Sequence, residues 1–90
     1  MKELKVKITD PVGLHGRPAS IISTKASKFN SEISIANLRT NKKGNLKSIM
    51  SVMSLGIKKG DEALITMNGA DEEEASKELL KVFEENLLIG

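Results

Sequence analysis

The chain has 90 residues, no cysteine and a formal net charge of +2, and aromatic residues make up 2% of it. This length leaves room for one hydrophobic core, so we expect a single domain over residues 1–90 with aliphatic side chains in its core. The absence of cysteine excludes disulfides and thiolate metal sites. Because no apolar stretch resembles a signal peptide or a membrane span, we expect a cytoplasmic protein that does not attach to membranes.

Charge is distributed unevenly along the chain. Residues 1–60 contain 12 Lys and Arg against 3 Asp and Glu, a net charge of +9, whereas residues 61–90 contain 2 against 9, a net charge of −7. An ordinary solvated surface also scatters its charges. A separation of this size nevertheless favours electrostatic steering of an acidic protein partner toward the basic part of the chain.

The first residues predict a half-buried strand, because Leu4, Val6 and Ile8 alternate with charged side chains. A break at residues 10–13 follows. The next segment holds the only histidine of the chain and reads Gly13-Leu14-His15-Gly16-Arg17-Pro18-Ala19.

Pro18 indicates that a helix begins directly after His15. Its fixed φ is helical, and its missing N–H would have no partner in the first turn anyway. His15 would then lie beside unpaired backbone N–H groups and the positive end of the helix dipole, and Arg17 adds a permanent cation. This pattern predicts an anion site, although a lone histidine at such a turn is equally often a cap or a solvated loop residue.

A neutral imidazole is a nucleophile, and an ordinary histidine, with a pKa of ~6.5, is mostly neutral near pH 7. Such a ring could attack phosphorus, and Arg17 and the helix N-terminus would then hold the phosphoryl oxygens. Gly13 and Gly16 would keep the approach open, Gly16 at some cost in helix stability. We expect no metal and no cofactor, since His15 has no second histidine or cysteine to form a metal site with.

Apolar side chains at helical spacing predict the first helix, with a stripe formed by Ala19, Ile22, Ala26 and Phe29. Ser23 lies off that stripe. Ile33 and Ile35 alternate with polar residues and predict a second strand, and the polar residues 41–45 predict a hairpin or a short third strand.

A helix of barely two turns is expected over residues 47–53, with Ser48 as its N-cap. Met50 and Met53 have the spacing of a buried stripe. A last strand follows, in which Ala63, Ile65 and Met67 share a face.

The final helix is predicted to begin at Asp71, which with Glu74 fits a capping box. Its buried stripe would be Ala75, Leu79, Val82 and Phe83, with Leu80, Leu87 and Leu88 less fully covered. Two long helices among alternating strands predict a two-layer α+β domain, with helices on one face of an antiparallel sheet.

Three segments together resemble the HPr family, the phosphocarriers of the bacterial sugar phosphotransferase system: residues 13–19, Asn45-Leu46-Lys47-Ser48-Ile49-Met50 and Met53-Ser54-Leu55-Gly56. The resemblance runs from about Leu4 to about Leu80. It implies an open-faced β-sandwich, in which three helices cover one face of a four-stranded antiparallel sheet of order 1-4-2-3. Gly16 departs from the family, where many members have alanine. The stretch of residues 39–44 is also slightly longer and more basic than the corresponding stretch in most members.

The resemblance implies that His15 accepts a phosphoryl group on Nδ1 from Enzyme I and passes it to IIA domains of sugar permeases, so the protein would be a carrier and not an enzyme. Arg17 matches the arginine that pairs with the phosphoryl group. Ser48 matches the serine that a kinase phosphorylates in Gram-positive-type members. Further partners would be this serine kinase/phosphorylase and a transcriptional regulator, and the protein would be a monomer. The implied docking residues are Ser20, Ile49, Met50 and Met53.

Two rival functions can be weighed on the sequence. A regulatory-only HPr paralogue acting through Ser48 would typically lack the active histidine, whereas His15 and Arg17 are both present. A nucleic-acid-binding domain could use the lysines of residues 42–59, but the near absence of aromatic residues disfavours stacking on single strands. We therefore expect no nucleic-acid partner.

Overall fold

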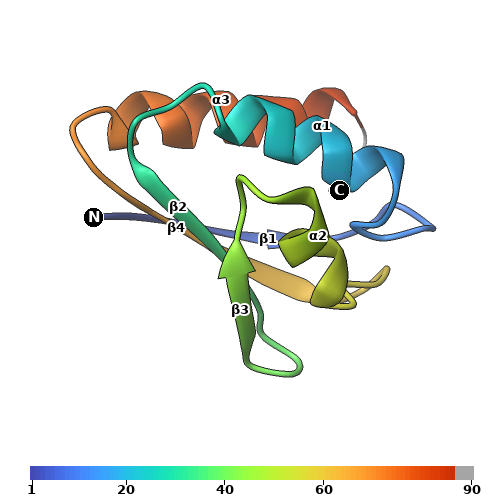
Figure 1. The fold of residues 1–90 in the computed structure, drawn as a ribbon. Helices are drawn as coiled ribbons and strands as arrows, with labels where there is room; N and C mark the ends of the chain where they lie inside the picture. Colours follow the sequence, from blue (N-terminus) through green and yellow to red (C-terminus); the bar gives the residue numbers. More distant parts are fainter. Residues whose placement is uncertain (87–90) are drawn as a thin grey trace.

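The computed structural model describes residues 1–86, which form four strands and three helices (Figure 1). In chain order they are β1 (Lys2–Lys7), α1 (Arg17–Ala26), β2 (Glu32–Asn37), β3 (Lys42–Asn45), α2 (Ile49–Ser54), β4 (Glu62–Asn68) and α3 (Glu72–Glu85). Each element lies within a few residues of its predicted position. Within the described residues, no helix combines the length and the apolar character that a membrane crossing needs.

The strands form one antiparallel sheet of order β1-β4-β2-β3. In the middle of it, Ile65 of β4 lies opposite Leu4 on one side and Ile35 on the other. Helices α1 and α3 run side by side over one face of the sheet, and α2 lies beside them near β3 (Figure 1). The predicted α+β class and the strand order implied by the family are both confirmed.

The core lies between the sheet and the helices, because alternate residues of each inner strand face the same side. From β2 and β4 it receives Ile33, Ile35, Ala63, Ile65 and Met67, all of them buried. Helix α3 contributes the predicted stripe of Ala75, Leu79, Val82 and Phe83. Leu80 is half-buried, as expected, whereas Leu87 and Leu88 lie outside the described residues.

Helix α1 is shorter than its apolar stripe predicted. It ends at Ala26, and Phe29 is buried from the turn that follows, where its N–H donates to the carbonyl of Ala26 at 3.2 Å. Ser23 was expected off the buried stripe, but it is only 2% exposed and its hydroxyl has no hydrogen-bond partner among the described residues. The buried face of α1 is thus wider than its apolar residues alone predict.

The capping box predicted at Asp71 and Glu74 is wrong. Asp71 precedes α3 but caps no N–H of it. Its carboxylate instead accepts hydrogen bonds from the backbone N–H groups of Asn30 and Ser31, at 2.8 and 2.9 Å, and from the Ser31 hydroxyl. These bonds hold the pKa of Asp71 below its ordinary value, the Ser31 hydroxyl being the largest cause. The residue joins the loop before β2 to the start of α3, a long-range contact that local spacing cannot reveal.

Candidate functional site

The loop of residues 8–16 joins β1 to α1 and carries His15. Asp10 organises it: its carboxylate accepts from the N–H of Val12 at 2.8 Å and its carbonyl from the N–H of Gly13 at 2.9 Å. Leu14 is 1% exposed and its N–H donates to the carbonyl of Ile57 at 3.1 Å. With Leu14 anchored inward, the next side chain, His15, is exposed.

Gly13 allows the loop to lie directly on the backbone of residues 57–58. Its φ is +78°, and a Cβ at this position would lie 2.3 Å from the carbonyl oxygen of Ile57. Any side chain would therefore push the loop away from this segment. The reason for this glycine is close backbone packing, and not the approach of a partner that the sequence suggested.

Gly16 lies outside helix α1, at its N-cap, with φ +55° and ψ −122°. A Cβ there would meet no atom within 4 Å. The expectation that Gly16 weakens the helix is thus wrong, because it is not a helical residue. Glycine suits the position through its backbone conformation, which other residues adopt only under strain.

The N-terminus of α1 is open to an anion. Pro18 lies in the first turn, no side chain caps that turn and no acidic residue lies in it. The N–H of Ser20 already donates to the carbonyl of Gly16 at 3.1 Å, but the earlier N–H groups of the helix have no intrahelical partner. Arg17 is exposed and takes part in none of the ion pairs found within residues 1–86. His15, these N–H groups and the free guanidinium thus occur together at one helix end.

Ser48 is the N-cap of α2, as expected. Its hydroxyl oxygen accepts a hydrogen bond from the N–H of Ser51 at 3.2 Å, and the residue is half-buried. Ser51 in turn accepts from the N–H of Asn45 through its hydroxyl at 2.9 Å. This contact explains Gly44, since a Cβ there would lie 2.4 Å from the Ser51 hydroxyl oxygen. The end of β3 and the first turn of α2 are therefore held together.

The four implied docking residues differ in exposure. Met50 is 82% exposed and Ile49 41% exposed, on a helix that contacts α1. Met53 is partly buried and packs against the core, and Ser20 on α1 is half-buried. Of these four residues, Ile49 and Met50 thus provide most of the exposed apolar surface.

Val12, a large apolar residue in the His15 loop, is 64% exposed, which the sequence did not indicate. An aliphatic side chain between a proline and a glycine has no periodicity that could assign it to core or surface. Its exposure follows from the Asp10 turn.

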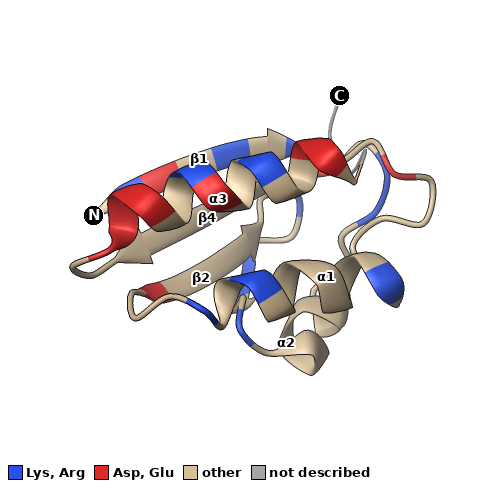
Figure 2. Ribbon diagram, turned by 90° about the horizontal axis from the view of Figure 1, so that it is seen from above, with Lys and Arg blue, Asp and Glu red and all other residues tan. Residues whose placement is uncertain are grey.

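The two charge regions lie on different elements. Helix α1 carries only basic charged residues, whereas α3 is mainly acidic (Figure 2). The two helices are joined by an ion pair between Lys25 and Glu78 at 3.2 Å. Among the described residues, no group of three or more His, Cys, Asp or Glu could hold a metal ion.

A family model described as the PTS HPr component phosphorylation site matches residues 2–85. The chain belongs to the HPr family. It is 46% identical to the phosphocarrier protein HPr of Mycoplasma pneumoniae over 89 residues, 99% of this chain and 100% of the relative. HPr proteins of this family are phosphocarriers of the sugar phosphotransferase system that carry a histidine phosphorylation site, and not enzymes.

Solved HPr structures share this fold. The histidine-containing phosphocarrier protein of a Mycoplasma superposes with a TM-score of 0.93 at 43% identity, covering 98% of each chain. HPr of Thermoanaerobacter tengcongensis superposes with a TM-score of 0.87 at 45% identity, covering 93% of this chain and 92% of that one. Identity at this level over the whole sheet and all helices assigns both fold and family.

Proposed function

We propose that His15 accepts a phosphoryl group on Nδ1 from phospho-Enzyme I and donates it to the IIA domains of sugar permeases. The observation that carries the proposal is the exposed imidazole beside the N-terminus of α1, where neither a capping side chain nor an acidic residue occupies the anion site. In each transfer a bond forms between phosphorus and the accepting group, while the bond from phosphorus to the donor breaks. No group changes its oxidation state, so the transfer needs no redox cofactor.

The phosphoryl group is negatively charged, so the site must stabilise this charge and still leave the group accessible to the next acceptor. The N–H groups of the first turn and the Arg17 guanidinium would hold its oxygens through charge-assisted hydrogen bonds. Because Arg17 is exposed and unpaired within residues 1–86, it can reach these oxygens without breaking an ion pair. An open site also leaves the phosphoryl group accessible to the next acceptor.

Docking of both partners is proposed on the surface formed by Ile49 and Met50, extended by Ser20 and Met53. Exposed methionine adapts to differently shaped partners, as a carrier with several acceptors requires. We further propose that the carrier acts as a monomer in the cytoplasm and that residues 1–90 form one domain.

Ser48 is the proposed site of regulation by a serine kinase/phosphorylase. A phosphate there would add about −1.5 to −2 charges at the N-cap of α2, where the helix dipole tolerates them. The fold would therefore change little, but a charge next to Ile49 and Met50 would make the docking surface costly to desolvate. A transcriptional regulator could recognise the phosphorylated form.

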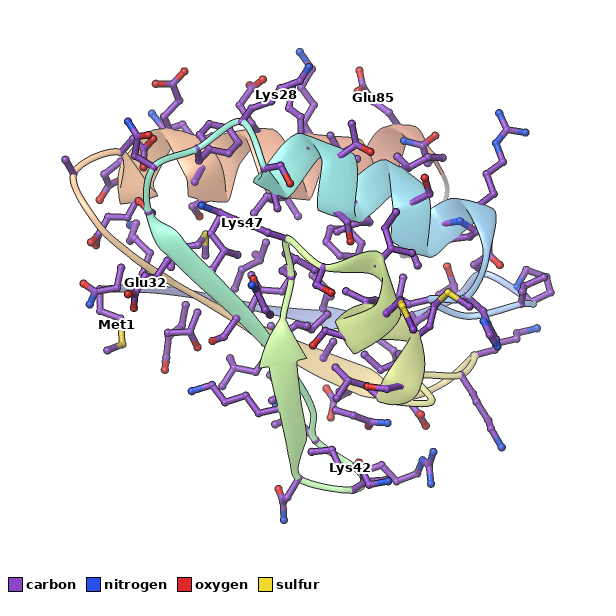
Figure 3. All side chains as sticks on the ribbon, viewed as in Figure 1. Met1, Lys28, Glu32, Lys42, Lys47 and Glu85 are labelled. Atoms are coloured by element: carbon purple, nitrogen blue, oxygen red, sulfur yellow. The ribbon has the colours of Figure 1, made fainter. Side chains whose placement is uncertain are left out.

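The rival functions gain little support. If the protein were a regulatory-only paralogue acting through Ser48, the open anion site at His15 would have no function. Nucleic-acid binding would draw on exposed lysines, but Lys47 turns back toward the body of the protein (Figure 3), where its ammonium group donates to the carbonyl of Phe29 at 2.7 Å.

The proposal is tested by incubating the protein with phosphoenolpyruvate, Mg²⁺ and a bacterial Enzyme I, and measuring intact mass before and after brief acid treatment. We expect one phosphoryl increment that acid removes. The His15→Ala protein should gain none. An unmodified wild-type protein in the presence of active Enzyme I would contradict the carrier function and leave the regulatory one.

A further inference from the structure

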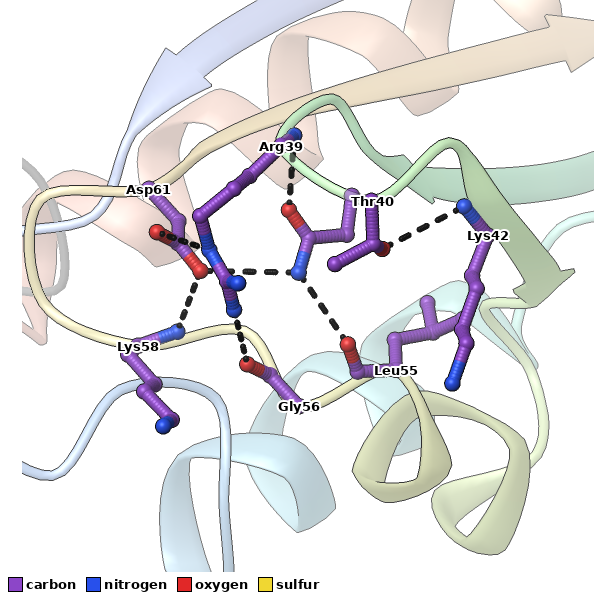
Figure 4. A network of polar contacts seen from close by, with 8 residues as sticks. Arg39, Thr40, Lys42, Leu55, Gly56, Lys58 and Asp61 are labelled. Atoms are coloured by element: carbon purple, nitrogen blue, oxygen red, sulfur yellow. Dashed lines mark hydrogen bonds and ion pairs between the residues drawn. The ribbon is translucent and has the colours of Figure 1, made fainter.

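A network of polar side chains forms hydrogen bonds with the segment that follows α2 (Figure 4). Asn37, at the end of β2, is fully buried. Its amide nitrogen donates to the carbonyl of Leu55 at 3.1 Å and to the carboxylate of Asp61 at 3.4 Å, and its side-chain oxygen accepts from the N–H of Arg39 at 3.1 Å. A buried amide with partners on both sides holds its neighbours in one arrangement.

Arg39 and Asp61 extend the network along the same segment. The Nε of Arg39 lies 3.0 Å from the Asp61 carboxylate, and its Nη2 donates to the carbonyl of Gly56 at 3.4 Å. The other carboxylate oxygen of Asp61 accepts from the N–H of Lys58 at 3.0 Å. The Arg39 hydrogen bond, followed by that of Lys58, holds the pKa of Asp61 below its ordinary value, so the carboxylate stays ionised.

These contacts satisfy backbone groups that α2 cannot satisfy itself. The carbonyls of Leu55 and Gly56, directly after the last residue of α2, have no donor within the helix, and here Asn37 and Arg39 supply donors to them. The segment also contains Gly56, with φ +61°, and Gly60, with φ +92°. Glycines leave a backbone free to move, so its position depends on the side chains that hold it.

The opposite side of this segment supports the His15 loop. The carbonyl of Ile57 accepts from the N–H of Leu14 at 3.1 Å, and Gly13 lies against the backbone of Ile57 and Lys58. The segment is therefore bonded to the network on one side and to the residue preceding His15 on the other. A shift of the segment would therefore displace Gly13 and Leu14, the two residues that precede His15.

We propose that Asn37, Arg39 and Asp61 are positioning residues for phosphoryl transfer, because they fix the Leu55–Lys58 backbone against which the loop of His15 is held. None of the three needs to touch the phosphoryl group. Displacement of a reacting group by about 1 Å can cost about 100-fold in rate, so partial loosening of this support slows transfer measurably. The inference rests on the proposed phosphoryl transfer at His15.

The test compares Arg39→Ala with Lys43→Ala, which removes a positive charge from the same hairpin but lies outside the network. The Arg39 side chain is 52% exposed, so truncating it to alanine leaves the core intact. Transfer from phospho-Enzyme I is measured as a function of carrier concentration. We expect Arg39→Ala to lower the maximal rate roughly 3- to 10-fold with little change in KM, and Lys43→Ala to leave the maximal rate unchanged.

A second readout separates positioning from general stability. Amide hydrogen exchange at Leu14 should become faster in Arg39→Ala, while exchange in the centre of β4 stays as in the wild type. Arg39→Lys, which keeps the charge but lacks the planar fork, should rescue the rate only in part. An unchanged maximal rate in Arg39→Ala, or an equal loss in Lys43→Ala, would overturn the inference. Absence of transfer to the wild-type protein would instead reject the proposed function itself.

Discussion

Gly16 connects the loop of His15 to helix α1 in a conformation with φ +55° and ψ −122°. This conformation turns the chain from the Leu14 anchor into the helix directly after the exposed His15. Positive φ values are rare for residues with a Cβ, and strain of this kind recurs at functional sites. The steric space around Gly16 is empty, so backbone strain alone decides which residues fit.

At this position we expect Gly16→Ala to lower the free energy of unfolding by about 1–3 kcal/mol, the cost of holding a residue in a disfavoured conformation. Gly16→Asn should cost less, because asparagine tolerates positive φ better. Urea denaturation measures both. Equal stability of wild type and Gly16→Ala would mean that the loop relaxes to a different backbone conformation.

At the scale of elements, α2 is only six residues long and depends on its ends. Ser48 caps its first turn, and Asn37 and Arg39 supply donors to the carbonyls of Leu55 and Gly56 directly after its end. An isolated helix of this length would not form in water. The proposed docking residues Ile49 and Met50 therefore owe their presentation to the caps and to the buried Val52 between the helix and the core.

We expect Ser48→Ala to destabilise the protein by about 1 kcal/mol through loss of the N-cap. Ser48→Asp should retain most of the stability, since aspartate also caps, but it should slow transfer from Enzyme I by adding charge beside the docking residues. Unfolding and transfer are measured for both, with Ser54→Ala at the other end of α2 as the control. Normal transfer by Ser48→Asp would contradict inhibition by charge.

Asp71 links two elements, and its lowered pKa makes that link dependent on pH. A carboxylate with a depressed folded-state pKa stabilises the protein above its ordinary value of 3.8 and loses this contribution as the pH falls through the lowered value. Asp71→Asn should therefore be less stable than the wild type at neutral pH, and the difference should shrink as the pH falls below 3.8.

Thermal unfolding over this pH range measures the effect. Asp61 and Glu72 also have lowered pKa values, so the wild type and Asp71→Asn both lose stability in acid, and only the gap between them reports on Asp71. Glu84→Gln, which neutralises an exposed carboxylate of α3, serves as the control. A gap that stays constant with pH would show that the variant acts through packing alone.

Across the whole molecule, the fold brings the two charge regions partly together, since each of the five ion pairs found within residues 1–86 joins a basic group of residues 1–60 to an acidic residue of residues 61–90. The acidic residues gather on α3, while the His15 loop lies beside basic residues 58–59, with Lys58 in direct backbone contact with Gly13. A field of one sign around a site raises the association rate of an oppositely charged partner by about 10- to 1,000-fold. We therefore expect the basic residues beside this loop to guide acidic partner proteins to His15.

Lys58→Gln should lower the association rate with Enzyme I by roughly twofold at low ionic strength, and the difference should fade as salt is added. Lys77→Gln makes the same change in net charge on α3 and should have little effect. Stopped-flow association measures both variants. An equal slowing would attribute the effect to net charge and not to its location.

The sequence by itself determined the strands, the helices and the position of the candidate site. Alternation and helical spacing can be read along the chain, and the Gly-Leu-His-Gly-Arg-Pro segment contains the proposed nucleophile, a cation and the helix start within six residues. The predicted strand at Ile33 and Ile35 and the Ser48 cap were confirmed for this reason.

Only the tertiary structure decided which partners the isolated polar residues have. Asp71 bonds to Ser31 instead of capping its own helix, Ser23 is buried although it lies off the apolar stripe, and Asn37, Arg39 and Asp61 meet beside the segment after α2. Each of these contacts joins residues distant in the sequence. A side chain can donate or accept in many directions, so its partner is set by the packing of the sheet and helices, which no local pattern encodes.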